Sequence, residues 1–211
     1  MSELILIGGG GHCHAAIDVI EAQDVHQVIG ILELSTFPHG DVLGYPILGT
    51  DKSLSSFSSR GISALVTIGQ IKTSVPRAKA YELATACGIE MPVVVSPRAY
   101  VSNRTSLSPG TLVMHRAVIN VGTVIGKNCI INSMALIEHD VVIGDHTHIA
   151  TGAIVNGDTK IGDRCFIGSG ATIANGLKIG DDCVIGSGAT VMTSLASGSL
   201  VKSTSVGVTY A

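Results

Sequence analysis

Apolar residues recur every six positions through the C-terminal half of the chain, without a break in register. Starting at Val101 and ending at Val191, all sixteen positions at this spacing are Val, Leu or Ile. The position four residues later is mostly small, and the position directly after each aliphatic residue is often Gly or Asn, the residues that most readily adopt a positive φ. A period of six fits neither an α-helix nor a plain amphipathic strand, but it fits a short strand followed by a corner.

Three such units would close one triangular coil, and stacked coils would pair their strands in parallel and bury the aliphatic column. The pattern resembles the hexapeptide-repeat, left-handed β-helix family. It predicts an all-β left-handed parallel β-helix with hexads over residues 101–196, in a domain that spans residues 96–211 and ends in a short C-terminal tail. Cys129, Cys165 and Cys183 fall in the small-residue column, which predicts buried packing thiols.

Residues 1–95 follow a different pattern. Apolar runs predict strands at Leu4–Ile7, Val28–Leu32, Ala64–Ile68 and Pro92–Val95, with a helix after the first run and another at Val75–Cys87. Strand, glycine loop, helix and strand make a βαβ unit, so these strands are expected in one parallel sheet. We therefore predict an α/β, half-Rossmann domain in front of the β-helix.

The first strand ends in Gly8–Gly11, followed by His12. Glycine at this place lets a phosphate group approach the backbone at a helix N-terminus. Glu33 ends the second strand, where an acid could bind a ribose hydroxyl. Because the domain is half a Rossmann fold and the glycines lack the GxGxxG spacing, a mononucleotide is favoured over NAD. The alternative is that the glycines only form a tight turn.

Composition narrows the class of protein. A net charge of −3, 3% aromatic residues and no Trp argue against a nucleic-acid partner. The start of the chain does not resemble a signal peptide and no apolar stretch reaches membrane length, so no membrane partner is expected. Five cysteines without a CxxC pair indicate a reducing compartment, which predicts a cytoplasmic protein.

His139 is the candidate general base, because a histidine titrates near the working pH and this one lies two positions past buried Ile137. An acid bonded to its other ring nitrogen would fix the tautomer. Glu138 lies in the Gly/Asn/acid column, which already explains its residue type, so Asp140 is favoured as the partner. His148 lies half a coil further on and hence on another side of the prism. The two histidines would converge only through a neighbouring subunit.

The remaining histidines have simpler explanations. His26, His39 and His146 are expected at solvated corners, and His115 is undecided between a solvated and a functional place. An alternative is a zinc site like that of β-helix carbonic anhydrases, drawn from the histidines at 115, 139, 146 and 148. The N-terminal nucleotide-type domain has no place in that interpretation, so no metal is expected.

Four motifs together resemble the NeuD/PglD-type sugar acetyltransferases: GGGGH at 8–12, YPILGTD at 45–51, TIGQ at 67–70 and IEHDVVIGDHTHIATGA at 137–153. The resemblance covers essentially the whole chain. It implies that the N-terminal domain holds the nucleotide of an activated amino sugar. It also implies that acetyl-CoA lies along the β-helix between the subunits of a homotrimer.

The resemblance also assigns residues. It implies that Gly10, Gly11, His12, Glu33 and Gly69 contact the substrate. It implies that His139 and Asp140 are the catalytic pair and that His148 lies near the thioester. Ser169 and Ser187 would contact the coenzyme. The chain departs from the family pattern at Cys13, at Leu34, where a second acid is common, and at Gly207–Thr209, which replaces the usual ending.

Together with the His139–Asp140 pair, the resemblance implies an acetyl-CoA-dependent N-acetyltransferase that acts on a nucleotide-linked 4-amino-4,6-dideoxy sugar for surface-glycan or glycoprotein synthesis. The same base chemistry serves a hydroxyl group, so O-acetylation of a sialic acid or related nonulosonate is an alternative. A non-catalytic trimeric scaffold is a third.

Overall fold

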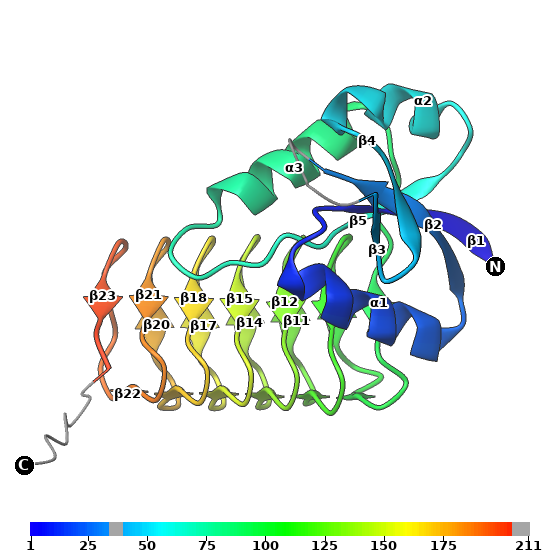
Figure 1. Ribbon diagram of the computed structural model, residues 1–211. Helices are drawn as coiled ribbons and strands as arrows, with labels where there is room; N and C mark the ends of the chain where they lie inside the picture. Colours follow the sequence, from blue (N-terminus) through cyan, green and yellow to red (C-terminus); the bar gives the residue numbers. More distant parts are fainter. Residues whose placement is uncertain (34–39, 204–211) are drawn as a thin grey trace, which may run out of the picture.

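A small α/β domain lies against one face of a β-helix in the computed structural model, with α3 running along the coils (Figure 1). The structure describes residues 1–33 and 40–203. Leu34, His39 and Gly207–Thr209, which entered the sequence predictions, lie outside the described residues.

The N-terminal sheet has the strand order β3-β4-β2-β1-β5, parallel except for the β3–β4 hairpin. Its strands are β1 (Ser2–Ile7), β2 (His26–Leu32), β3 (Asp41–Val42), β4 (Tyr45–Gly49) and β5 (Ser63–Val66). The predicted strands near residues 4, 28 and 64 are therefore confirmed. Strands β3 and β4 were not predicted, because β3 is only two residues long and β4 contains no buried residue.

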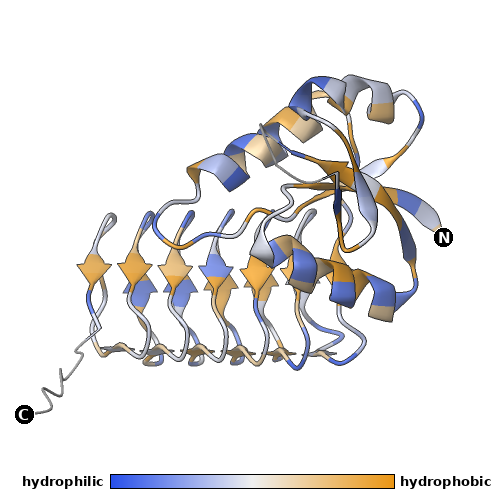
Figure 2. Ribbon diagram, in the orientation of Figure 1, coloured by the Kyte–Doolittle hydropathy of each residue, from blue (hydrophilic) through white to orange (hydrophobic). Residues whose placement is uncertain are grey.

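Helices cover both faces of this sheet. They are α1 (Gly11–Gln23), the short 3-10 helix η1 (Asp51–Ser53), α2 (Leu54–Ser58) and α3 (Val75–Ala86). Successive side chains of a strand point to opposite faces, so Leu4 and Leu6 pack with α1 while Ile5 and Ile7 pack with α2 and α3. This double burial explains why the strands are continuous apolar runs, which Figure 2 shows as hydrophobic ribbons.

Three parallel sheets of two-residue strands form the left-handed β-helix. The first sheet contains β6 (Val94–Val95), β9 (Leu112–Val113), β12 (Ile130–Ile131), β15 (His148–Ile149), β18 (Phe166–Ile167), β21 (Val184–Ile185) and β23 (Leu200–Val201). The second contains β7 (Tyr100–Val101), β10 (Val118–Ile119), β13 (Leu136–Ile137), β16 (Ile154–Val155), β19 (Thr172–Ile173) and β22 (Thr190–Val191). The third contains β8 (Ser106–Leu107), β11 (Val124–Ile125), β14 (Val142–Ile143), β17 (Lys160–Ile161) and β20 (Lys178–Ile179).

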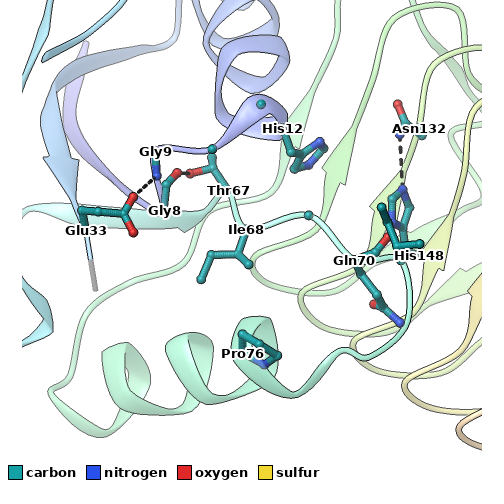
Figure 3. A pocket seen from close by; sticks show the side chains of 14 residues that line it. Gly8, Gly9, His12, Glu33, Thr67, Ile68, Gln70, Pro76, Asn132 and His148 are labelled. Carbon is teal, nitrogen blue, oxygen red and sulfur yellow. Dashed lines mark hydrogen bonds between the residues drawn. The ribbon is translucent and has the colours of Figure 1, made fainter. Parts of the chain in front are cut away.

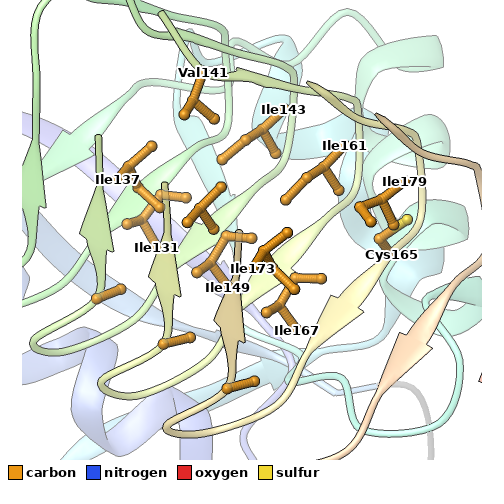
Figure 4. Packing of buried hydrophobic residues seen from close by; sticks show 14 of the residues in the cluster. Ile131, Ile137, Val141, Ile143, Ile149, Ile161, Cys165, Ile167, Ile173 and Ile179 are labelled. Atoms are coloured by element: carbon orange, nitrogen blue, oxygen red, sulfur yellow. The ribbon is translucent and has the colours of Figure 1, made fainter. Parts of the chain in front are cut away.

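The aliphatic column fills the interior of the prism, as the hexad pattern predicts. Ile137, Ile143 and Ile149, one from each sheet, point toward one another and are almost completely buried (Figure 4). The predicted packing role of the cysteines is confirmed, since Cys129, Cys165 and Cys183 are buried in the same core. Burial raises the pKa of Cys129 and of Cys165 to about 12, so these thiols stay protonated.

The strand expected at Pro92–Val95 does not join the N-terminal sheet. As β6 (Val94–Val95), it pairs in parallel with Leu112 and Val113 of β9 in the first sheet of the β-helix. The physical reason is that the hexad register extends back from Val101 to Val95, so Val95 continues the inner column. The β-helix therefore begins one hexad earlier than the hexad pattern from Val101 predicts.

The positive φ angles also lie elsewhere in the repeat. They occur at the third residue after the aliphatic positions from Leu107 to Ile185, for example at Asp140 (φ 59°) and Asp158 (φ 58°). Glycines directly after an aliphatic residue, such as Gly144 and Gly162, are not left-handed. A Cβ there would lie within 2.6–2.9 Å of the backbone of the next coil, so close stacking of the coils excludes a side chain.

The N-terminal domain packs on the first sheet of the β-helix mainly through α1. Leu112 and Met114 of the first coils share one buried cluster with Ile17 and Ile20 of α1. Within the described part of the chain, no helix is long and apolar enough to cross a membrane.

Candidate active site

A pocket of about 610 Å³ opens between the carboxyl ends of the N-terminal strands and the first sheet of the β-helix (Figure 3). Ligands of open parallel sheets bind at such strand ends. The pocket is lined by Gly8, Gly9, Gly10, Gly11, His12, Glu33, Thr67, Ile68, Gly69, Gln70, Ile71, Pro76, Asn132 and His148. The structure thus brings all five predicted substrate contacts together with His148.

The glycine loop presents an open helix N-terminus to this pocket. A Cβ at Gly10 or Gly11 would meet nothing within 4 Å, and Gly10 caps α1 without a side-chain bond. Glu33 braces the loop, because its Oε2 accepts a 2.6 Å hydrogen bond from the backbone of Gly9. Thr67 donates a bond of the same length to the carbonyl of Gly8. A free helix N-terminus of this kind suits a phosphate group.

His148 forms the β-helix wall of the pocket, and β15 is the hydrophilic strand among hydrophobic neighbours in Figure 2. Its Nδ1 lies 3.1 Å from the carbonyl oxygen of Gln70, and its Nε2 lies 3.2 Å from Nδ2 of Asn132. A carbonyl only accepts, so the proton is on Nδ1 and Nε2 accepts from the amide. Burial, followed by the neighbouring His12 and Arg77, lowers the pKa of His148 to about 3.

His12 faces the same space from α1, with its ring centroid 6.1 Å from that of His148. Burial and the charge of Arg77 lower the pKa of His12 to about 4, so both rings are neutral near pH 7. Nε2 of His12 is buried without a hydrogen-bond partner among the described residues. His12 therefore lines the pocket with a neutral ring whose Nε2 has no partner in the described part of the chain.

Arg77 and Gln70 join the two domains beneath the pocket. Arg77 of α3 is fully buried and donates to the carbonyls of Asn128 and His146 and, at 2.8 Å, to Oε1 of Gln70. The amide of Gln70 in turn donates to the carbonyls of Arg164 and Cys165, at 3.3 Å each. The carbonyls at 128, 146 and 164 belong to one corner of three successive coils. This role of Arg77 and Gln70 was not predicted from the sequence, because most of their partners are backbone carbonyls, which no residue type reveals.

His139 and Asp140 lie on another edge of the prism, in the turn between β13 and β14, and do not line the pocket. Nδ1 of His139 is 2.9 Å from Oδ2 of Asp140, and both side chains are largely exposed. Glu138 instead accepts from Nδ2 of Asn120. The structural explanation for Glu138 therefore holds, but the residue type of Asp140 has one as well, because Asp140 occupies the left-handed position of the turn. The hydrogen bond is what distinguishes Asp140.

Ser169 and Ser187 lie on a third part of the surface. They are exposed first residues of the turns that follow β18 and β21, at the same corner as Ser133 and Thr151. Within one chain, the structure therefore separates three features that the sequence assigned to one reaction: the pocket with His148, the His139–Asp140 pair, and this corner of hydroxyl residues.

The other histidines are held by neighbours. His146 is half-buried, with Nδ1 2.9 Å from Asn128 and its ring edge-on to Tyr81, so the expected solvated corner is wrong. His115 bridges Oγ of Ser96 at 2.6 Å and Oδ2 of Asp18 at 2.7 Å, which links α1 to the first coil. Across residues 1–33 and 40–203, no group of three or more His, Cys, Asp or Glu could hold a metal ion.

Family models match both halves of the chain. The PglD N-terminal domain matches residues 3–82, and the bacterial transferase hexapeptide model (six repeats) matches residues 122–157 and 158–192. Among curated protein sequences, none matches the chain.

Solved structures are similar along the whole chain. One is a perosamine N-acetyltransferase from Caulobacter crescentus, solved as a histidine-to-asparagine mutant in complex with CoA and GDP-perosamine. It is 30% identical to this chain with a TM-score of 0.90, and the alignment covers 96% of this chain and 94% of that chain. The acetyltransferase domain of PglB from Neisseria gonorrhoeae, in complex with acetyl coenzyme A, is 30% identical with a TM-score of 0.87. The alignment covers 95% of this chain and 96% of that chain. WeeI from Acinetobacter baumannii is 25% identical with a TM-score of 0.83, and the alignment covers 95% of this chain and 96% of that chain.

Proposed function

Because the chain belongs to the NeuD/PglD-type family of hexapeptide-repeat sugar acetyltransferases, we propose that it transfers the acetyl group of acetyl-CoA to the amino group of a nucleotide-linked 4-amino-4,6-dideoxy sugar. The observation that carries this proposal is the likeness over 96% of the chain to an enzyme whose structure holds both CoA and GDP-perosamine. The pocket with its open helix N-terminus suits the nucleotide part of such a substrate.

His139 is proposed as the base of the reaction. With a proton on Nδ1 donated to Asp140, its Nε2 carries a free lone pair. The sugar amine attacks the thioester carbon, a C–N bond forms, Nε2 takes the amine proton and CoA leaves as the thiolate, which is then reprotonated. In the related Caulobacter enzyme, a histidine is replaced by asparagine or alanine in complexes with CoA and GDP-perosamine, which supports a functional histidine.

We propose a homotrimer in which the active site lies between subunits. Val121, Val124 and Val142 form an exposed apolar patch next to His139, and Val124 pairs directly with Val142. An exposed apolar patch at a candidate catalytic edge is typical of an interface. In a cyclic trimer, that edge would face a different surface of the next subunit, which would bring His139 toward a neighbour's pocket.

We place this activity in the cytoplasm. The five cysteines, all within the described residues, are free, and Cys13, Cys129, Cys165 and Cys183 are buried as unpaired thiols. Free thiols are usual in a reducing compartment.

The direct test is release of free CoA from acetyl-CoA with a panel of acceptors: GDP- and UDP-linked 4-amino-4,6-dideoxy sugars, their 4-hydroxy counterparts and sialic acid. We expect thiol release with a nucleotide-linked amino sugar and an acetamide product by mass spectrometry. Release only with a hydroxyl acceptor would replace N-acetylation by O-acetylation. Release with none of these acceptors would contradict the proposal.

A further inference from the structure

Gly157 occupies a corner position at which other coils carry side chains. The first residue of the turn between the second and third sheets is Asn103, Val121, His139, Gly157 or Asn175 in successive coils. None of these residues has a positive φ. The backbone at this corner therefore accepts L-residues with side chains, and the fold itself does not require glycine at position 157.

The space above Gly157 is filled by His139 of the preceding coil. A Cβ built on Gly157 would lie 2.6 Å from Nε2, 2.7 Å from Cε1 and 3.2 Å from Cδ2 of His139. These are the three nearest atoms, and none belongs to the backbone. Even the smallest side chain would have to displace the imidazole ring, by roughly 0.8 Å before ordinary contact is reached.

We propose that Gly157 is a positioning residue: because it has no side chain, the His139 imidazole can lie over it while Nδ1 stays bonded to Asp140. The proposal rests on the proposed function, since it assigns to Nε2 the role of base. Asp140 lies over a glycine in a similar way, because a Cβ on Gly122 of the coil before would lie 2.3 Å from its Oδ1. Gly122 has a φ of +76°, so its backbone favours glycine in any case, and Gly157 provides the cleaner test.

The position of the His139 ring over Gly157 has to satisfy two requirements of a general base. The ring must keep its 2.9 Å bond to Asp140, and its other nitrogen must remain accessible. A methyl group at 157 would press on the Nε2 edge and turn the ring away from that geometry. A misplacement of about 1 Å at a reacting group can cost about 100-fold in rate.

The test compares Gly157→Ala with Asn175→Ala, which changes the same corner one coil further on. We expect Gly157→Ala to lower kcat by about 10- to 100-fold. The KM for acetyl-CoA and the midpoint of thermal unfolding should stay close to those of the parent protein. Asn175→Ala should keep full kcat. An unchanged kcat in Gly157→Ala would overturn the proposal.

A double variant separates this positioning role from any other role of Gly157. In a His139→Ala background there is no ring to displace, so Gly157→Ala should cause no further loss of rate. An equal loss in both backgrounds would overturn the proposal. If Gly157→Ala does not fold, His139→Ala/Gly157→Ala should restore folding, and its failure to do so would show that the backbone was the obstacle.

The position of the ring is a readout that does not depend on activity. A crystal structure of Gly157→Ala should show the His139 ring turned away from Asp140, whereas an unmoved ring would contradict the positioning role. If the parent protein releases no CoA with any acceptor, the proposed function fails, and this structure still decides whether Gly157 positions the ring.

Discussion

At the scale of single residues, the His139–Asp140 pair depends on a backbone feature as much as on charge. Asp140 has a φ of 59°, a conformation that Asp, Asn and Gly adopt more readily than other residues. The carboxylate reaches Nδ1 of the preceding residue from that conformation. Because of this, replacement of Asp140 by Ala or Glu would mix a backbone effect with the loss of the hydrogen bond, whereas Asn keeps both shape and φ preference.

Asp140→Asn is therefore expected to lower kcat by about 10-fold or more without unfolding the coil, because the amide stabilises neither the required tautomer nor the imidazolium. Steady-state CoA release measures it. Asp158→Asn is the matched control, since Asp158 has the same φ one coil further on and follows a glycine instead of a histidine. Equal losses in the two variants would argue that the effect is structural.

The two neutral histidines of the pocket predict how stability depends on pH. In the unfolded chain a histidine has a pKa of about 6.5, whereas burial lowers the pKa of His12 to about 4 and of His148 to about 3. Below about pH 6.5 the unfolded chain binds protons that the folded chain does not, so the free energy of unfolding falls as the pH drops, on the order of 1 kcal/mol per pH unit for each histidine.

Urea unfolding near pH 7 and near pH 5 tests this prediction. His148→Asn should reduce the difference between the two conditions, and the same substitution at His14, an exposed residue of α1, is the matched control. A difference that stays the same in His148→Asn would show that other groups cause the acid sensitivity.

At the scale of elements, strands of two residues persist because every strand inside a sheet pairs with the coils on both sides, with partners eighteen residues apart. The α/β domain is held differently. α1 contributes an apolar contact and the Asp18–His115 pair, while α3 contributes the buried Arg77, whose charge is bound by carbonyl oxygens. Loss of these bonds would leave several buried carbonyls without a donor.

Arg77→Met is expected to lower the free energy of unfolding by about 2–5 kcal/mol. It should also release the loop at Gln70, whose carbonyl holds Nδ1 of His148. Chemical denaturation measures the first effect, and the affinity for a nucleotide sugar measures the second. Asp18→Asn weakens the other domain contact, where the carboxylate is exposed, and should cost less than about 1 kcal/mol. Equal costs would contradict the special role of Arg77.

At the scale of the whole molecule, the pocket and the His139 edge lie on different parts of one chain. Such a division is effective only if subunits assemble so that one contributes the base and its neighbour the substrate pocket. The apolar patch at Val121, Val124 and Val142 lies where that contact would form.

If the proposed trimer forms through this patch, Val142→Glu should give monomers and lower kcat by at least about 10-fold, because a buried unpaired carboxylate is costly at an interface. Light scattering with a parallel activity assay checks both. Lys160→Glu is the control, since Lys160 pairs with Val142 in the next coil but is already polar. An active monomer of Val142→Glu would contradict the shared site.

Mixing two inactive variants tests the sharing directly. His139→Ala removes the base, and Gly10→Leu places a side chain in the pocket. If the site lies between subunits, co-refolded mixtures should regain about a quarter of the parent activity, because random assembly pairs two intact halves at that frequency. Mixtures that remain inactive would mean that base and pocket act within one chain.

The hexad repeat could be predicted in detail because one residue type in one register determines each coil. Its inner column extended one unit further back than expected, to Val95, and glycines after the aliphatic residues proved to reflect close stacking of coils instead of positive φ. The pocket residues could be predicted from the motifs, since glycines and strand ends are local features. Arg77 and Gln70 could not, because their partners are carbonyl oxygens, which carry no residue-type signal in the sequence.

By itself, the sequence determined the β-helix, the βαβ domain and the residue types of the pocket, because periodic burial and glycine loops depend on near neighbours along the chain. The spacing of nine residues already placed His139 and His148 on different sides of the prism, and only the tertiary structure decided that His148 lines the pocket and that the His139 ring lies over Gly157. These two features depend on how the side chains of neighbouring coils and of the N-terminal domain pack against one another, and the hexad pattern does not specify those contacts.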